Sequence, residues 1–285
     1  MREGDISAAI IGVGLMGGSL AGALKQTGKF REVVGVDVNE TTLAQAQQKG
    51  FIDRGETDVH VAASQADLII LATPVRHIIR LLKDLGPDLK EGTLVMDIGS
   101  TKAKVVAAMN QLPSTIEAIG GHPMTGAMTA GVSGANPIMF HNRTFILTPT
   151  QRSSDETVAW LQDLLKSIGA NVIIMDAERH DQNTAIISHL PRFLPIPLIA
   201  LATKSGDDMT MQLAAGGFRA MTSGAAENPN MWTDVVLTNP DNLIAAIRGL
   251  QGHLDELVKT IEIGDESSIR SMMNDAQLQW EKRYG

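Results

Sequence analysis

Short apolar runs alternate with amphipathic stretches through the first half of the chain. The apolar runs lie at 8–11, 33–36, 68–72, 94–97, 116–120, 144–147 and 172–175. Strands that are apolar on both faces are typical of a parallel sheet that helices cover on each side. Crossover helices are predicted by the longer stretches at 18–27, 41–49, 100–111 and 155–168. The pattern predicts a doubly wound α/β domain.

The strand pattern ends near residue 176. Helical patterns follow at 176–204, 208–222 and 240–263. In the last of them, apolar side chains recur at alternating spacings of four and three residues, at Leu243, Ile247, Leu250, Leu254, Leu257 and Ile261. Such a seam packs along another helix, either within one subunit or across a dimer interface. We expect a sheet domain at 1–170, an all-helical dimerisation domain at 171–285, and a homodimer.

A glycine-rich turn directly follows the first predicted strand and opens a helix. Gly12 permits the tight turn, Gly14 lets the backbone approach a pyrophosphate, and Gly17 lets helix and strand pack closely. Leu15 and Met16 lie at the start of the helix, where free backbone N–H groups and the helix dipole favour an anion. These residues predict a Rossmann-type dinucleotide site.

An acidic residue at the end of the second predicted strand selects the cofactor. Asp37 lies 20 residues after Gly17, where a carboxylate accepts hydrogen bonds from the adenosine ribose. It would repel a 2′-phosphate, so NAD is favoured over NADP. Thr73 and Pro74 follow the strand at 68–72 and are expected to line the nicotinamide half of the site.

Length and composition exclude several classes of protein. The 285 residues exceed what one core usually organises, which supports two domains. The net charge is −8 and no Lys/Arg cluster is present, so we expect no nucleic-acid binding. The absence of cysteine removes disulfides, thiolate nucleophiles and Cys-ligated metals. We expect no metal site.

The chain shows no sign of secretion or membrane insertion. Its first residues carry charges of both signs and then enter a short strand, unlike a secretory signal. The longest apolar stretch, 190–202, contains Arg192 and two prolines and is shorter than the roughly 20 residues that a membrane helix needs. A cytoplasmic protein without a membrane partner is expected.

Two further segments follow predicted strands, Asp-Ile-Gly-Ser-Thr-Lys at 97–102 and Gly-Gly-His-Pro-Met-Thr-Gly at 120–126. Both lie at carboxyl ends of strands, the edge where open α/β sheets bind ligands. His122 stands there between glycines and a proline. Because imidazole has an ordinary pKa of about 6.5, it can accept a proton at neutral pH, and we predict that His122 is catalytic.

Taken together and in this order, the motifs resemble those of prephenate dehydrogenases, a family that includes arogenate dehydrogenases. They are the turn at 12–19, the segments 97–102 and 120–126, Ile-Ser-His-Leu-Pro at 187–191, Gly-Gly-Phe-Arg at 216–219, and Asn-Pro-Asn-Met-Trp at 228–232. The resemblance implies a dimer and the NAD-dependent oxidative decarboxylation of prephenate to 4-hydroxyphenylpyruvate in tyrosine biosynthesis.

The resemblance also implies roles for individual residues. His122 would be the general base on the ring hydroxyl, and Ser100, beside the cofactor, would hydrogen-bond that hydroxyl or orient His122. His189 would be catalytic and contact substrate, unless it is a core histidine paired with a carbonyl group. Arg219 matches a family position and is expected to bind substrate. Lys102 is either a surface cation or a residue near the substrate.

Three positions depart from the family pattern. Met128 replaces a residue that is commonly acidic, Arg192 replaces a histidine, and Ser223 replaces an arginine that binds a substrate carboxylate. A buried, unpaired carboxylate costs several kcal/mol. We therefore expect Arg192 to bind the small carboxylate substrate in place of that arginine, or the pocket to be adapted to another substrate.

Other functions stay open at this point. The substrate could be arogenate or another cyclohexadienyl compound. A β-hydroxyacid dehydrogenase would place a catalytic lysine on the first helix of the second domain, where this chain has no lysine before Lys204. A third possibility is a relative that binds NAD without turnover.

Overall fold

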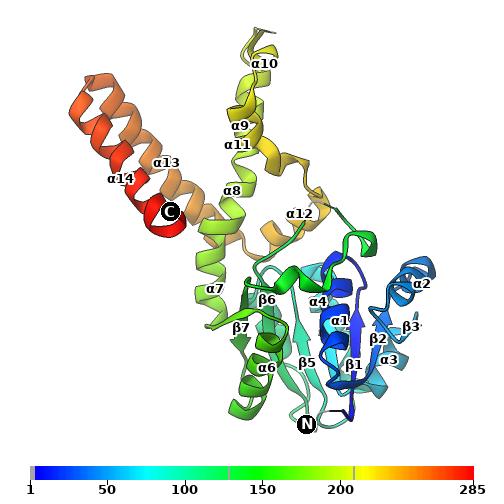
Figure 1. The fold of residues 1–285 in the computed structure, drawn as a ribbon. Coiled ribbons are helices and arrows are strands. Elements are labelled where there is room, and N and C mark those ends of the chain that lie inside the picture. Colours follow the sequence, from blue (N-terminus) through cyan, green and yellow to red (C-terminus); the bar gives the residue numbers. More distant parts are fainter. Residues whose placement is uncertain (1–3, 128, 208) are drawn as a thin grey trace. The chain divides into compact units, whose positions relative to one another are not determined.

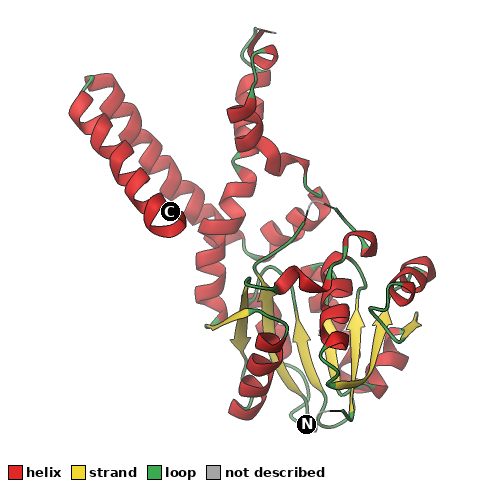
Figure 2. Cartoon of the chain, in the orientation of Figure 1, coloured by secondary structure: helices red, strands yellow, loops and turns green. Residues whose placement is uncertain are grey.

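The computed structural model describes residues 4–127, 129–207 and 209–285. An eight-stranded sheet dominates it, in the order β3-β2-β1-β4-β5-β6-β7-β8 (Figures 1 and 2). The strands are β1 Ile6–Ile11, β2 Phe30–Val36, β3 Arg54–Glu56, β4 Leu68–Leu71, β5 Leu94–Asp97, β6 Glu117–Pro123, β7 Thr144–Pro149 and β8 Asn171–Ile174. Each predicted strand has a counterpart, so the predicted doubly wound α/β fold is confirmed.

Two features of the sheet differ from the prediction. Strand β7 runs antiparallel to β6, whereas the other pairs are parallel. The described residues of the connection from β6 to β7 form only the short 3₁₀ turns Val132–Gly134 and Pro137–Phe140, and not the crossover helix that a parallel return requires. Strand β3 was not predicted, because its sequence Arg-Gly-Glu carries no apolar signal.

Helices cover both faces of the sheet (Figure 2). They are α1 Leu15–Gln26, α2 Glu40–Gln48, α3 Val59–Gln65, α4 Val75–Leu85, α5 Ala103–Met109 and α6 Asp155–Ser167. Successive residues of β1 enter two separate cores: Ala8 and Ile10 belong to one, Ala9 and Ile11 to the other. This double burial is why the strands read as continuous apolar runs.

The predicted helix 176–204 is divided into several helical elements. These are α7 Ala177–Thr184, a π-helical turn Ala185–His189, α8 Leu190–Phe193 and α9 Pro195–Thr203. Prolines at 191 and 195 remove backbone N–H donors within this run, which interrupts the regular hydrogen-bond ladder. The elements α10 Met209–Gln212, α11 Gly216–Thr222 and α12 Pro229–Thr238 follow.

Over Ala177–Thr203 the helical run is 27 residues long and reaches a mean hydropathy of 1.6, with 22% of that window buried. Within the described ranges it is the one helix whose length and composition would suffice to cross a membrane. The expectation that no apolar segment is long enough was therefore wrong, because it counted only 190–202. Core helices of soluble proteins pass the same test.

Two compact units make up the chain, Met1–Asn239 and Pro240–Gly285. The domain boundary expected at residue 170 lies inside the first unit and stays a prediction. The second unit is a helical hairpin of α13 Pro240–Ile263 and α14 Glu266–Tyr284. The seam on α13 is largely exposed, with Leu254 and Ile261 at 49% and 58%.

Candidate active site

The glycine turn has the geometry that a dinucleotide site needs. Gly12 has a φ of +97°, and a Cβ there would lie 2.9 Å from the Ala72 carbonyl oxygen. A Cβ at Gly17 would lie 1.9 Å from the carbonyl oxygen of Gly12, so only glycine lets helix α1 approach β1. By contrast, a Cβ at Gly14 would meet nothing within 4 Å. Gly14 therefore borders open space at the start of α1.

Asp37 is held in place beside this turn. Its carboxylate accepts hydrogen bonds from the backbone N–H groups of Val13 at 3.1 Å and Asn39 at 3.0 Å. The N-cap of α1, Gly14, provides no side-chain cap, so the first N–H groups of Leu15 and Met16 are available to an anion. These features fit the pyrophosphate and ribose of NAD.

Thr73 and Pro74 follow β4 at the same edge of the sheet. The hydroxyl oxygen of Thr73 is buried and has no hydrogen-bond partner within the described part of the chain. Buried polar atoms are usually paired, so this one is suited to a ligand group. Pro74 is exposed and is the N-cap of α4.

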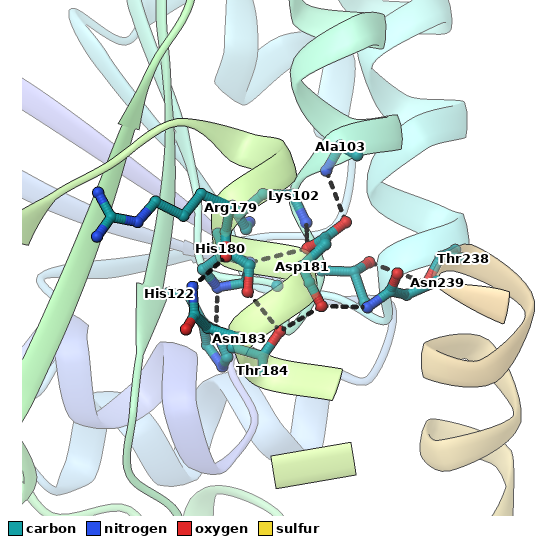
Figure 3. A network of polar contacts seen from close by, with 12 residues as sticks. Lys102, Ala103, His122, Arg179, His180, Asp181, Asn183, Thr184, Thr238 and Asn239 are labelled. Atoms are coloured by element: carbon teal, nitrogen blue, oxygen red, sulfur yellow. Dashed lines mark hydrogen bonds and ion pairs between the residues drawn. The ribbon is translucent and has the colours of Figure 1, made fainter. Parts of the chain in front are cut away.

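His122 lies within β6, although the sequence suggested that it follows the strand. It pairs with Ile146 of β7 and is 8% exposed. Its Nδ1 is 2.7 Å from Nε2 of His180, a residue of α7 (Figure 3). His180 Nδ1 in turn lies 2.8 Å from the carboxylate of Asp181. Three side chains thus form one buried line of hydrogen bonds.

Asp181 joins α7 to the loop before α5 (Figure 3). Its carboxylate accepts hydrogen bonds from the backbone N–H groups of Lys102 at 2.7 Å and Ala103 at 2.9 Å. Its own carbonyl oxygen accepts a hydrogen bond from the Asn239 side chain at 2.8 Å. These contacts anchor Asp181 from two separate segments of the chain.

Lys102 was expected at the surface or near the substrate, and the first of these expectations is wrong. Its side chain is fully buried and forms an ion pair with the equally buried Asp97. Burial lowers the pKa of Lys102 and raises that of Asp97, while each partner opposes the other's shift. Backbone N–H groups of Gly99 and Gly121 also bind the Asp97 carboxylate. The ion pair and these backbone hydrogen bonds connect the end of β5 to the loop before α5 and to β6, in which His122 lies.

Burial lowers the pKa of His122 well below its usual value of 6.5. Repulsion from His180, Lys102 and His189 adds to this shift. The imidazole is therefore neutral throughout the neutral pH range. A neutral imidazole is the form that can accept a proton.

His189 belongs to the π-helical turn and is 1% exposed. Neither ring nitrogen has a well-formed hydrogen bond to any described residue, although the Ser100 carbonyl group lies close enough to favour protonation. Burial lowers the His189 pKa to about 4; Asp181 opposes this shift, and His180 adds to it. Pairing of His189 with a carbonyl group, here that of Ser100, therefore stays an alternative. A buried ring nitrogen without a well-formed hydrogen bond among the described residues is suited to a ligand group.

Comparison with known proteins shows the family of this chain. The model of the prephenate dehydrogenase nucleotide-binding domain matches residues 20–174, and that of the prephenate dehydrogenase dimerization domain matches residues 176–275. The chain belongs to the prephenate dehydrogenase family. The resemblance read from the motifs is thereby confirmed.

Individual relatives of this prephenate dehydrogenase family member cover nearly the whole chain. Prephenate dehydrogenase of Lactococcus lactis is 36% identical, covering 94% of this chain and 75% of its own. Cyclohexadienyl dehydrogenase of Zymomonas mobilis is 30% identical, covering 94% and 93%. A crystal structure of prephenate dehydrogenase from A. aeolicus, in complex with hydroxyphenyl propionate and NAD+, has a TM-score of 0.90 at 28% identity and covers 98% of both chains.

The other predicted site residues of this family member lie on several elements. Ser100 is half-buried in the loop before α5, which begins at Ala103 and not at residue 100. Arg192 on α8 forms an ion pair with Glu227, and Arg219 on α11 is exposed. Met128 lies outside the described residues. Ser223 is exposed after α11.

Arg192 and Glu227 share a third partner. The Trp232 indole N–H donates to Glu227 at 2.6 Å, and the Arg192 guanidinium lies 5.8 Å from the Trp232 ring centre. Trp232 also contacts His189 edge to face, with ring centres 6.2 Å apart. The Arg192–Glu227 ion pair, which is partly exposed to solvent, thus contacts the same Trp232 ring as His189.

Sequence reasoning missed His180, Asp181 and Asp97 as members of the site. The adjacent His-Asp pair at the start of α7 was a usable signal, because neither residue suits the apolar face of a helix. Its partner His122 is 58 positions away, so only folding joins them. Among the described residues, no group of three or more His, Asp or Glu side chains could hold a metal ion.

Proposed function

We propose that this chain catalyses the NAD-dependent oxidative decarboxylation of prephenate to 4-hydroxyphenylpyruvate, a step of tyrosine biosynthesis. The observation that carries the proposal is His122: a buried, neutral imidazole at the ligand-binding edge of a sheet, of which only Nδ1 is engaged by another described side chain. Its Nε2 is left to act as general base.

The chemistry balances with one base and one hydride acceptor. His122 Nε2 takes the proton of the ring hydroxyl, and the carbinol carbon becomes a carbonyl as its hydride leaves. Loss of the ring carboxylate as CO₂ then leaves the electron pair of the broken bond in the ring and gives the aromatic phenolate, which takes the proton back from His122 to become the phenol. Bound NAD supplies the hydride acceptor. The Gly12–Gly17 turn and Asp37 would hold its pyrophosphate and ribose, and Thr73 and Pro74 would line the nicotinamide half.

Several side chains complete the proposed substrate site. Ser100 lies at the same sheet edge and would hydrogen-bond the ring hydroxyl or orient His122. His189, buried and without a partner among the described residues, would donate to or accept from substrate or cofactor. Arg192 would bind the side-chain carboxylate. Arg219 is assigned to the substrate site on the family resemblance alone.

A second substrate is favoured by a specific observation. Arg192 is paired with Glu227, and the two side chains are 43% and 21% exposed. A neighbouring cation and anion suit the carboxylate and ammonium groups of an α-amino acid side chain. Arogenate carries such a side chain, whereas prephenate carries a keto acid. The pair therefore makes arogenate the alternative substrate.

We also infer a cytoplasmic homodimer, with a domain boundary near residue 170. The family model that matches 176–275 describes a dimerization domain. The exposed apolar seam of α13 supports the same conclusion.

NADH formation from NAD tests the proposal, with prephenate and arogenate offered separately to the purified protein. We expect NADH with at least one of them and a preference that identifies the substrate. Binding of NAD without NADH from either substrate would instead support a relative that binds the cofactor without turnover.

A further inference from the structure

The hydrogen bonds behind His122 have a defined direction. Asp181 accepts from two backbone N–H groups, and as a carboxylate it can only accept. His180 must therefore donate to it from Nδ1, across 2.8 Å. In a neutral imidazole the other nitrogen is then an acceptor, so Nε2 of His180 accepts the 2.7 Å hydrogen bond from Nδ1–H of His122.

This direction determines which nitrogen of His122 can act as a base. With its proton on Nδ1, His122 carries its lone pair on Nε2. If the line ran the other way, His180 would donate to Nδ1 and the His122 proton would sit on Nε2, where it would block proton transfer from the substrate. Asp181 thus sets the tautomer of His122 through two successive hydrogen bonds, by way of His180.

We propose that His180 and Asp181 are positioning residues that hold His122 in the tautomer with a free Nε2. They also stabilise the imidazolium that forms: as the substrate O–H bond breaks and the Nε2–H bond forms, the Nδ1–H of His122 shifts its charge toward His180 and the Asp181 carboxylate. This inference rests on the proposed function, because it assigns His122 the role of base.

The charges of the groups around His122 explain why its imidazolium needs the hydrogen bonds to His180 and Asp181. The titratable groups that face His122 are Lys102 from the loop before α5, His189 from the π-helical turn and His180 from α7. Lys102 and a protonated His189 or His180 disfavour a positive charge on His122, whereas a neutral His180 accepts its Nδ1–H and favours that charge. Asp97 is already paired with Lys102. Among the described residues, Asp181 is the carboxylate that hydrogen bonds link to His122, and His180 forms that link.

The decisive variant is Asp181→Asn. Oδ1 of Asp181 accepts from both His180 Nδ1 and the Lys102 N–H, and Oδ2 accepts from the Ala103 N–H. An asparagine with its NH₂ group at the position of Oδ1 donates to His180 Nδ1, which reverses the line and places the His122 proton on Nε2. An asparagine with its NH₂ group at the position of Oδ2 leaves the line unchanged. By analogy with the same substitution in serine protease triads, we expect kcat to fall about 10²- to 10⁴-fold while KM and NAD affinity change little. A folded Asp181→Asn protein in which NMR shows the His122 proton on Nε2, but whose kcat stays within about threefold of the parent with an unchanged pH profile, would overturn the proposal.

Asparagine also has one acceptor fewer for the backbone N–H groups of Lys102 and Ala103, so a second pair of variants is needed. His180→Gln retains an acceptor near the position of Nε2, whereas His180→Leu does not. We expect His180→Gln to recover part of the roughly 100-fold loss in kcat of His180→Leu. Equal loss in both would indicate a structural role only. Thr184→Val is the matched control, because its buried hydroxyl bonds only backbone carbonyls of α7, and we expect its kcat to stay within about twofold.

A readout without turnover separates this inference from the proposed function. Nitrogen NMR of the ¹⁵N-labelled protein shows which ring nitrogen of His122 carries the proton, and we expect Nδ1 in the parent and Nε2 in Asp181→Asn. A proton on Nε2 in the parent would refute the tautomer assignment even in an active enzyme. Absence of NADH from either substrate, with Nδ1 protonated, would refute only the proposed reaction.

Discussion

The buried histidine His189 makes the stability of the protein depend on pH, and the size of the effect follows from the structure. Burial lowers its pKa from 6.5 to about 4. Between these values the unfolded chain binds a proton that the folded chain excludes, so the free energy of unfolding rises with pH. A shift of 2.5 units corresponds to about 3 kcal/mol. This stability is present above pH 6.5 and is lost as the pH falls toward 4.

His189→Leu removes the titrating group at similar side-chain volume. From pH 7 to pH 4, the parent should lose about 3 kcal/mol more of its free energy of unfolding than the variant. His122 shifts in the same direction, but both proteins retain it, so their difference isolates His189. At pH 7 the variant should be at least as stable, because two unpartnered ring nitrogens leave the core.

Urea unfolding followed by circular dichroism, at several pH values and one protein concentration, measures this difference. The chain has seven histidines, so an NMR titration of their ring protons gives the His189 pKa directly. Parallel stability curves for the two proteins between pH 7 and pH 4 would refute the reasoning. So would a His189 that titrates near 6.5.

Three further outcomes are expected. His122→Asn should lower kcat about 10²- to 10⁴-fold with NAD affinity unchanged. In the parent, kcat/KM should fall only well below pH 6.5, because the pKa of the base is lowered. A fall of kcat/KM centred at pH 6.5 would contradict this. Arg192→Ala should raise KM for the carboxylate substrate about tenfold or more with kcat little changed, as steady-state kinetics would show, and an unaffected KM would place the anchor elsewhere. Gly17→Ala should lower the melting temperature, because its Cβ would meet the Gly12 carbonyl oxygen. Gly14→Ala should instead weaken NAD binding, measured by calorimetry, at an unchanged melting temperature. Equal melting temperatures of the two variants would contradict the packing argument.

The sequence by itself determined seven of the eight strands and the nucleotide turn, because the signals for both are local. Residues 8–17 contain a buried strand, a turn and the start of a helix, and the spacing of three glycines reports the approach of backbone to backbone and to phosphate. Asp37 follows from the same unit of strand, helix and strand. Periodicity over four to ten residues is enough for such features.

Only the tertiary structure decided how the catalytic histidine is supported. His122 and His180 are 58 positions apart, and the buried Lys102 looks in sequence like any cation near a helix start. The direction of β7 and the π-helical turn at His189 likewise depend on packing between distant segments. The hydrogen-bond direction and the pKa of a buried imidazole depend on which groups surround it after folding, and no local pattern encodes those neighbours.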